Sequence, residues 1–185
     1  MQGKEREDDV IVDTYLEYLA EVRHLSEHTV ISYRKDLEDY LRFLGERKVL
    51  LRDVTQSDAR RYVAYLMRDR HFNPVTVNRK LSCLRRFHHH VLVRGMCAVN
   101  PFERIEGTTR YRRLPEVIDR ETIIRLLSVE ITDFTSLRDS MMFHLFYSTG
   151  CRLSELLDAD VGDLETSGER LLVRGKGNRQ RYVFI

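Results

Sequence analysis

A single glycine separates two helical patterns in the second half of the chain, and this break constrains the fold more than any other feature. Before Gly150, apolar residues recur at helical spacing over 141–146, and glycine favours the left-handed cap that ends such a helix. A new apolar face begins at 153–157, so Arg152 falls at a helix start, where free N–H groups and the helix dipole favour an anion. Arg152 is therefore a candidate phosphate ligand. The alternative is that it only pairs with Glu155, one turn further on.

A glycine-rich turn between two β-prone runs predicts a hairpin over residues 171–185. Lys176 lies between Gly175 and Gly177, which allow the backbone at the tip to approach a ligand closely. A lysine at such a tip is often only solvated. Because Lys176 follows Arg152 by 24 residues in a helix-to-hairpin arrangement, the two cations together form a more specific pattern than either one alone.

These two segments resemble the tyrosine recombinase (phage integrase) family, and within it the Xer-type site-specific recombinases. Residues 149–156 resemble the family's first catalytic arginine box, and residues 175–178 resemble its catalytic lysine hairpin. The resemblance implies that Arg152 and Lys176 are catalytic and that Glu155 supports Arg152 by orienting it. It also implies strand cleavage and rejoining through a 3′-phosphotyrosyl intermediate, which needs no metal and no cofactor.

The family places a histidine-x-x-arginine box, a further histidine or tryptophan and the nucleophilic tyrosine after the lysine hairpin. This sequence ends at Ile185, within the second strand of the hairpin, and none of its seven histidines is followed three residues later by arginine. No nucleophile is therefore assigned in this chain. We expect the chain to be truncated and unable to cut or rejoin DNA by itself.

The overall composition is that of an ordinary globular chain, with 42% hydrophobic and 32% charged residues. The net charge is only +2, so a nucleic-acid surface must come from local segregation of charge. Three cysteines without a CxxC spacing indicate reduced thiols. No membrane span and no export signal is apparent, so we expect a cytoplasmic protein.

Apolar residues at helical spacing predict four helices in the first half of the chain, and the charged residues 1–9 are expected to fray. The expected helices cover 10–23, 26–45, 54–67 and 73–95. The sequence over 26–33 and 77–87 is also similar to the family's N-terminal core-binding (SAM-like) domain. We therefore expect a DNA-binding domain over residues 10–106.

Basic residues gather off the apolar side of the fourth helix, where no acidic residue occurs between Asn73 and Val99. Such a face suits the backbone and major groove of double-stranded DNA, although a solvated face is the alternative. The three consecutive histidines at 88–90 are not a metal site, because neighbouring helical residues point about 100 degrees apart. The candidate DNA-binding residues of this domain are Thr29, Arg34, Lys35, Arg79, Lys80, Arg85 and Arg86.

A linker is predicted over residues 107–115, where apolar residues are nearly absent and Arg110, Arg112 and Arg113 offer further phosphate contacts. Residues 116–185 are then expected to form the first part of an α+β catalytic domain. This part begins with helices over 116–127 and 135–148 and ends in the hairpin. The predicted fold is thus mainly α-helical.

The leading hypothesis is that the chain is part of a Xer-type recombinase that resolves chromosome dimers and acts on DNA as a homo- or hetero-tetramer. A mobile-element integrase is the alternative within the same family. A second hypothesis is a DNA-binding module that occupies recombination sites without chemistry. A third is a helical interaction protein whose basic helix meets an acidic partner.

Overall fold

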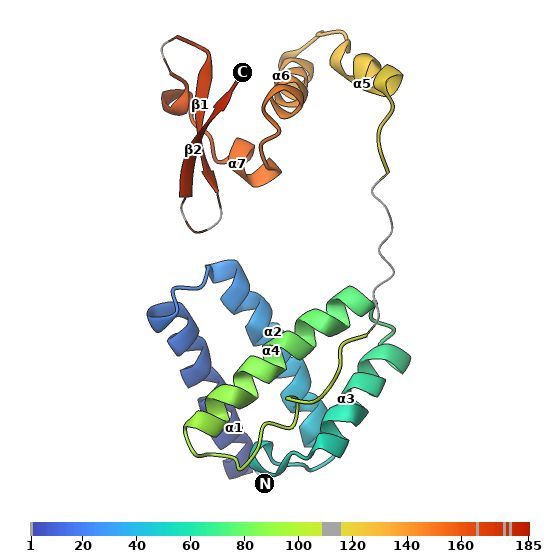
Figure 1. Ribbon diagram of the computed structural model, residues 1–185, viewed down its shortest axis with the longest axis vertical. Helices are drawn as coiled ribbons and strands as arrows, with labels where there is room; N and C mark the ends of the chain where they lie inside the picture. The colour runs from blue at the N-terminus through green and yellow to red at the C-terminus, as the bar shows by residue number, and fades with distance from the viewer. Residues whose placement is uncertain (1, 109–115, 166, 176, 178) are drawn as a thin grey trace. The chain divides into compact units, whose positions relative to one another are not determined.

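The computed structural model describes residues 2–108, 116–165, 167–175, 177 and 179–185. The chain divides into two compact units, which we call unit 1 (Met1–Arg112) and unit 2 (Arg113–Ile185). Unit 1 is helical, and unit 2 combines helices with a C-terminal antiparallel hairpin (Figure 1). The prediction of a mainly α-helical chain that ends in a hairpin is confirmed.

The described residues of unit 1 form four α-helices, with one π-helical turn and one 3-10 turn between them (Figure 1). The elements are α1 (Gln2–Glu17), η1 (Tyr18–Val22), α2 (Glu27–Glu46), η2 (Leu51–Asp53), α3 (Gln56–Arg68) and α4 (Pro74–Val93). Helix α2 packs against α1, η1 and α4, and α4 packs against α1, α2 and α3.

Capping residues explain where α3 and α4 begin. The Thr55 side chain accepts a hydrogen bond from the backbone N–H of Asp58, whose carboxylate in turn accepts from the backbone N–H of Thr55. Asn73 caps α4 through the backbone N–H of Thr76, and Pro74 occupies the first helical position. Both helices begin within two residues of the starts expected from the sequence.

Helix α1 begins at Gln2, so the expectation that residues 1–9 fray is wrong for the part of this segment that the structure describes. Asp8 explains part of the difference between the expected frayed segment and the observed helix. Its carboxyl group is half-buried and accepts a hydrogen bond from the backbone N–H of Leu51. Burial raises the pKa of Asp8 above its usual value. The start of α1 is thus tied to the 3-10 turn η2.

Aromatic side chains fill the core of unit 1 between α1, α2, α3 and α4. The rings of Tyr40 and Tyr62 meet edge to face with centroids 5.0 Å apart, and Phe43 meets Tyr62 in the same way at 4.9 Å. Such pairs are each worth about 1 kcal/mol beyond the burial of their area. This core fixes how α2 packs against α4. The packing in turn determines which polar residues of the two helices reach the surface.

In the part of unit 2 that the structure describes, the chain forms three α-helices, a 3-10 turn and the hairpin (Figure 1). The two strands pair antiparallel with Val173 opposite Arg181 and Gly175 opposite Arg179. The elements are α5 (Arg120–Leu127), α6 (Phe134–Thr149), α7 (Leu153–Leu157), η3 (Val161–Asp163), β1 (Arg170–Gly175) and β2 (Arg179–Phe184).

The core of unit 2 is small and joins α7 to the hairpin. It is formed by Cys151, Leu156, Leu171, Val173 and Val183. Helix α5 buries none of its residues, and many apolar side chains of α6 are exposed. Within the described ranges, no helix combines the length and the apolar character that crossing a membrane requires.

Candidate functional site

Helix α6 ends at Gly150, as the sequence predicted, and this stop places Arg152 at the start of α7. Gly150 has φ 59° and ψ 22°, and its N–H donates to the carbonyl of Phe146. Such a left-handed conformation favours glycine. Arg152 follows in an extended conformation as the N-cap residue of α7. The turn thus directs the chain so that Arg152 precedes the free N–H groups of a new helix.

The carboxylate of Glu155 is fully buried and holds two arginines. Oε1 accepts from Nη1 of Arg152 at 2.6 Å and from Nη1 of Arg181 at 2.7 Å. Oε2 accepts from the backbone N–H of Arg152 at 2.9 Å and from Nη2 of Arg181 at 2.8 Å. The hydrogen bonds from Arg181, followed by those from Arg152, hold the pKa of Glu155 well below its usual range, so this carboxylate remains ionised.

The pairing of Arg152 with Glu155, which the sequence offered as an alternative to phosphate binding, is present but does not bury the arginine. The Arg152 side chain remains 69% exposed. One Nη atom is bonded to Glu155, and the other donors of the planar guanidinium remain to bind an anion. The two interpretations are therefore compatible in this geometry.

Arg181 is a site residue that our sequence analysis did not select. It lies on β2, opposite Val173, and its guanidinium reaches Glu155 with two parallel hydrogen bonds. The sequence could have indicated this position, because side chains two residues apart on a strand lie on the same face of the sheet. Arg181 therefore shares a face with the buried Val183. The Arg181 side chain stays 43% exposed, whereas the buried Glu155 carboxylate needs cationic partners, and Arg181 is one of them.

The first strand of the hairpin passes close to the same carboxylate. A Cβ atom added to Gly175 would lie 2.8 Å from Oε1 of Glu155, so only glycine fits there without displacing the carboxylate. The neighbouring Arg174 binds Asp163 of η3 through two hydrogen bonds of 2.8 and 2.5 Å. The hairpin is thereby fixed against both α7 and η3.

A shallow hollow opens beside this cluster. Three arginines line it. The nearby carboxylate of Glu155 is already paired with two of them, Arg152 and Arg181. The hollow therefore has a positive charge and suits an anion. The predicted catalytic Lys176 lies outside the residues that the structure describes, although Gly175 and Gly177 on either side of it are described. The lining residues are Arg152, Gly175, Gly177, Arg179, Gln180 and Arg181.

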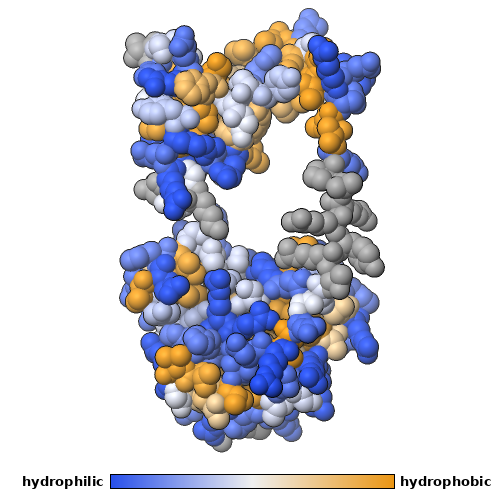
Figure 2. Space-filling model, in the orientation of Figure 1, coloured by the Kyte–Doolittle hydropathy of each residue, from blue (hydrophilic) through white to orange (hydrophobic). Residues whose placement is uncertain are grey.

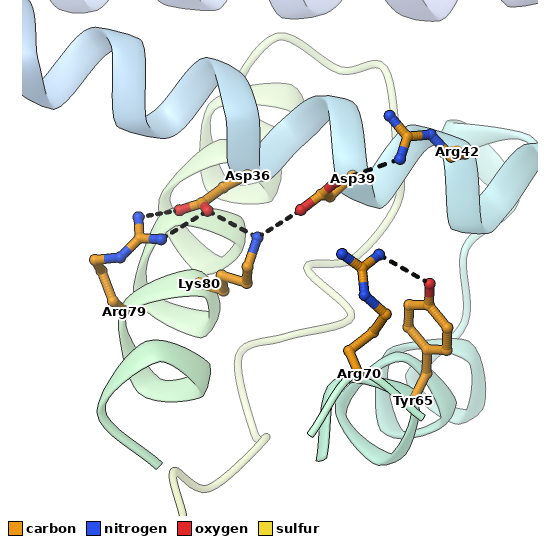
Figure 3. Close-up of polar contacts among 7 residues, drawn as sticks. All are labelled: Asp36, Asp39, Arg42, Tyr65, Arg70, Arg79 and Lys80. Carbon is orange, nitrogen blue, oxygen red and sulfur yellow. Dashed lines mark hydrogen bonds and ion pairs between the residues drawn. The ribbon is translucent and has the colours of Figure 1, made fainter. Parts of the chain in front are cut away.

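In unit 1, the expectation that Lys80 stands on the exposed basic face is wrong. Its side chain is only 5% exposed, and Nζ binds Asp36 at 2.9 Å and Asp39 at 3.0 Å (Figure 3). Both carboxylates come from α2, so Lys80 joins α4 to α2. A buried ammonium group needs such partners because the loss of hydration is costly.

Arg79 binds the same buried carboxylate and yet reaches the surface. Its two Nη atoms bond to the two oxygens of Asp36, with Nη2 to Oδ1 at 2.9 Å (Figure 3). About half of the Arg79 side chain remains exposed. Arg85, in contrast, donates to the backbone carbonyls of Phe102 at 3.3 Å and Ile105 at 2.8 Å. Arg85 therefore fastens the segment after α4 to this helix.

The remaining candidate DNA-binding residues of unit 1 lie at or near the surface. Arg34 is exposed and pairs with Asp13 at 2.7 Å, Lys35 is exposed, and the half-buried Thr29 bonds to the Ser26 hydroxyl at 2.9 Å. Arg86 is exposed and has a long 3.5 Å contact with the hydroxyl of Tyr33. Arg110, Arg112 and Arg113 lie outside the described residues.

The start of the predicted linker is held in a defined position. The side-chain amide of Asn78 donates to the carbonyl of Thr108 at 2.9 Å and accepts from its backbone N–H at 2.8 Å. Gly107 passes so close that an added Cβ would lie 2.7 Å from the Asn78 oxygen. Helix α4 therefore holds Thr108, at the start of the predicted linker, through Asn78.

The three consecutive histidines diverge, as helical geometry requires. His88 is fully buried and its Nε2 lies 3.0 Å from the hydroxyl of Tyr40. His90 packs instead against Tyr15 and Tyr18 at ring-centroid distances of 5.0 and 4.8 Å. Over the ranges that the structure describes, no group of three or more potential ligands is arranged to hold a metal ion.

Both units match protein-family models. Residues 12–95 match the phage integrase N-terminal SAM-like domain, and residues 116–185 match the phage integrase family. The chain belongs to the tyrosine recombinase (phage integrase) family. The family recognised in the sequence is therefore confirmed, and the arginine cluster of unit 2 lies in the part of this tyrosine recombinase that matches the integrase family model.

Curated Xer recombinases are similar to this family member over most of its length. Tyrosine recombinase XerC of Listeria innocua is 37% identical over 172 residues, which cover 91% of this chain and 57% of that protein. Tyrosine recombinase XerD of Shewanella oneidensis is 33% identical over 176 residues, which cover 95% and 58%. The chain thus spans a little over half the length of these relatives.

Solved recombinase structures share the fold of this tyrosine recombinase. A lambda integrase dimer bound to a COC′ core site has a TM-score of 0.72 at 15% identity, with coverage of 95% of this chain and 61% of that chain. XerH bound to its difH substrate has a TM-score of 0.63 at 14% identity, with coverage of 92% and 51%. At these identities, the similarity concerns the fold alone.

Proposed function

We propose that this chain is the DNA-binding and phosphate-holding part of a site-specific recombinase. Arg152 binds the non-bridging oxygens of the scissile phosphate, and Glu155 orients Arg152. The observation that carries this proposal is the buried carboxylate of Glu155, which fixes Arg152 while 69% of the arginine side chain stays exposed. A fixed cation of this kind stabilises the charge that develops on the phosphate in the transition state.

Lys176 takes the second role in the proposed reaction, as the acid that protonates the departing 5′ oxygen. A lysine can donate this proton when its surroundings lower its pKa. The support for this role is the place of Lys176 in the sequence between Gly175 and Gly177, which both line the hollow together with the arginines. The attacking group in the family is a tyrosine, so the reaction proceeds through a covalent 3′-phosphotyrosyl intermediate without a cofactor.

Unit 1 is proposed to bind double-stranded DNA through the exposed residues of α2 and α4. Thr29, Arg34, Lys35, Arg79 and Arg86 remain candidates for this surface, and Arg110, Arg112 and Arg113 remain candidates in the linker. Two structural relatives, lambda integrase and XerH, are described as bound to a core site and to the difH substrate, which supports DNA as the partner. Lys80 and Arg85 are better assigned to holding unit 1 together, given their buried and backbone contacts.

The biological role is proposed to be chromosome-dimer resolution by a tetramer of recombinases. The support is the similarity to XerC and XerD. An integrase of a mobile element is the second candidate, since a transposon integrase is among the proteins of similar fold. We also propose that this chain alone binds DNA without cleaving it, because the family's nucleophilic tyrosine has no counterpart in its motifs.

Titration of a labelled duplex, followed by fluorescence anisotropy at two salt concentrations, tests the DNA-binding part of this proposal. We expect binding that weakens steeply with salt, and a loss of about tenfold in affinity with a smaller salt dependence in Lys35→Ala/Arg86→Ala. Arg60→Ala/Arg68→Ala is the matched control, since it removes the same charge from exposed positions of α3. Equal losses in both variants would contradict a specific surface on α2 and α4.

A nicked duplex that traps covalent intermediates tests the proposed lack of cleavage. We expect no protein–DNA adduct on a denaturing gel after incubation with this chain. An adduct formed by the chain alone would show that one of its own tyrosines attacks the phosphate. That result would overturn the proposal that this chain does not cleave DNA by itself.

A further inference from the structure

A groove in unit 1 has the features of a peptide-binding site. It lies between the π-helical turn η1 and the C-terminal half of α4. The N–H of Arg23 donates to the carbonyl of Tyr18 at 3.1 Å, five residues back, and the N–H of Leu25 donates to the carbonyl of Leu19 at 3.0 Å. Single π-helical turns are rare and occur frequently at functional sites. This turn supplies Tyr18, Leu19 and Arg23 to the groove.

The floor of the groove is apolar and aromatic. Leu25 and Val93 line it together with Tyr18, and the Val93 side chain is largely solvent-accessible, with 72% of the residue exposed. The ring of His90 packs at 4.8 Å from Tyr18, and burial, followed by the charge of Arg94, lowers the pKa of this histidine. His90 is therefore neutral at neutral pH and belongs with the apolar floor. Figure 2 shows a hydrophobic patch, surrounded by hydrophilic residues, over the C-terminal end of α4.

Cations dominate the rim of the groove. Arg23 and Arg86 are exposed there, and Glu103 is the acidic residue among the lining residues. Within the described part of the chain, neither Arg23 nor Arg86 lies within ion-pair distance of a carboxylate. These guanidinium groups therefore remain able to bind an anionic group.

We propose that this groove binds an acidic amphipathic peptide segment of a partner protein, with an apolar side chain on the Leu25–Val93 floor and carboxylates on Arg23 and Arg86. The apolar floor favours a peptide over duplex DNA, because phosphates on the outside of a duplex leave aliphatic side chains such as Val93 without a partner. An acidic amphipathic peptide can contact the apolar floor with its apolar side chain and bind the arginines of the rim with its carboxylates at the same time. This inference does not depend on the catalytic assignments in unit 2.

The test uses a fluorescein-labelled peptide of about 12 residues in which glutamates flank a pair of leucines, titrated with the full chain. We expect saturable binding that Val93→Asp and Arg23→Glu each weaken by about tenfold. Val75→Asp and Arg68→Glu are the matched controls, because both residues are exposed and lie outside the groove. The controls should bind within about twofold of the unchanged chain. Circular dichroism of each variant confirms that it is folded.

Two further peptides separate the contributions of the groove. We expect weaker binding when the glutamates are replaced by glutamines and when the leucines are replaced by serines. Absence of binding by the acidic peptide, or equal losses in Val93→Asp and Val75→Asp, would overturn the proposal. The proposal would also be overturned if Val93→Asp weakened binding of a labelled DNA duplex as much as binding of the peptide, because the groove would then be part of the DNA-binding surface. Duplex binding that Val93→Asp leaves unchanged would support the proposal.

Discussion

Arg181 of β2 donates two parallel hydrogen bonds to the buried carboxylate of Glu155, at 2.7 and 2.8 Å. The same carboxylate binds the side chain and the backbone N–H of Arg152. The hairpin and the start of α7 are thus connected through one charged group. The position of the exposed Arg152 guanidinium therefore depends on a residue of the hairpin, and not only on its own helix.

The low pKa of Glu155 predicts a specific pH dependence for Glu155→Gln. Because the folded-state pKa lies below the unfolded value, the stability from ionised Glu155 is present above about pH 4.5 and is lost as the pH falls further. The destabilisation caused by Glu155→Gln should therefore be largest above pH 5 and shrink at lower pH. Urea unfolding of unit 2, followed through the NMR amide signals of the hairpin, measures it. Glu169→Gln, at an exposed position, is the control. A difference that stays constant down to pH 3 would refute this linkage.

Gly175→Ala is expected to disturb the same carboxylate without removing any charge. The new Cβ would lie 2.8 Å from Oε1 of Glu155, so the carboxylate must move away from Arg181 or Arg152. We expect the pKa of Glu155 to rise toward its ordinary value, as a carbon-13 NMR titration of the carboxyl group would show. Gly162→Ala is the matched control, because no atom lies within 4 Å of the Cβ position there. An unchanged titration in Gly175→Ala would mean that the strand shifts instead of the carboxylate.

Local signals in the sequence were sufficient to predict the elements that carry the arginine cluster. The glycine stop at Gly150 and the start of α7 at Arg152 depend on residues within one turn of each other. The hairpin also depends on its own glycine-rich turn. Such short-range preferences can be read from a single sequence because the competing conformations are penalised locally.

The partners of charged residues could not be predicted in the same way. Lys80 is separated by 44 residues from Asp36 and by 41 residues from Asp39, and only the packing of α4 against α2 brings them together. The helical pattern of α4 placed Lys80 on a polar face, but it contained no information on what covers that face. The π-helical turn after α1 was likewise missed, since its apolar pattern continues that of a regular helix.

Lys80→Met is expected to destabilise unit 1 by about 3 kcal/mol, because it leaves a buried carboxylate with fewer partners. Asp36 would keep Arg79, but Asp39 would keep only the 3.6 Å contact with Arg42. Urea unfolding at pH 7 measures this loss. Lys35→Met is the control, since Lys35 is exposed on α2. If Lys80→Met and Lys35→Met have the same small effect, the contacts in Figure 3 do not stabilise the pairing of α2 and α4.

Because His88 is buried, we expect unit 1 to lose stability at mildly acidic pH. Burial lowers its pKa to about 3, whereas an unfolded histidine titrates near 6.5. Between these values the unfolded chain binds a proton that the folded chain does not, so stability falls as the pH decreases below 6.5. Lowering the pH from 7 to 5 should cost unit 1 about 2 kcal/mol.

The variant His88→Gln tests the origin of this loss, because glutamine can still bond to the Tyr40 hydroxyl but does not titrate. Its stability at pH 7 should be lower than that of the unchanged chain, since glutamine fills the aromatic core poorly. Most of the dependence of its unfolding free energy on pH between 7 and 5 should be absent, and a smaller remainder should come from His90, whose pKa is also lowered. The exposed His28→Gln control should keep the full dependence. Apart from Asp8, whose pKa is raised, carboxylates contribute little in this window because their ordinary pKa values lie near 4. A pH dependence that persists in His88→Gln would assign the loss to another titrating group.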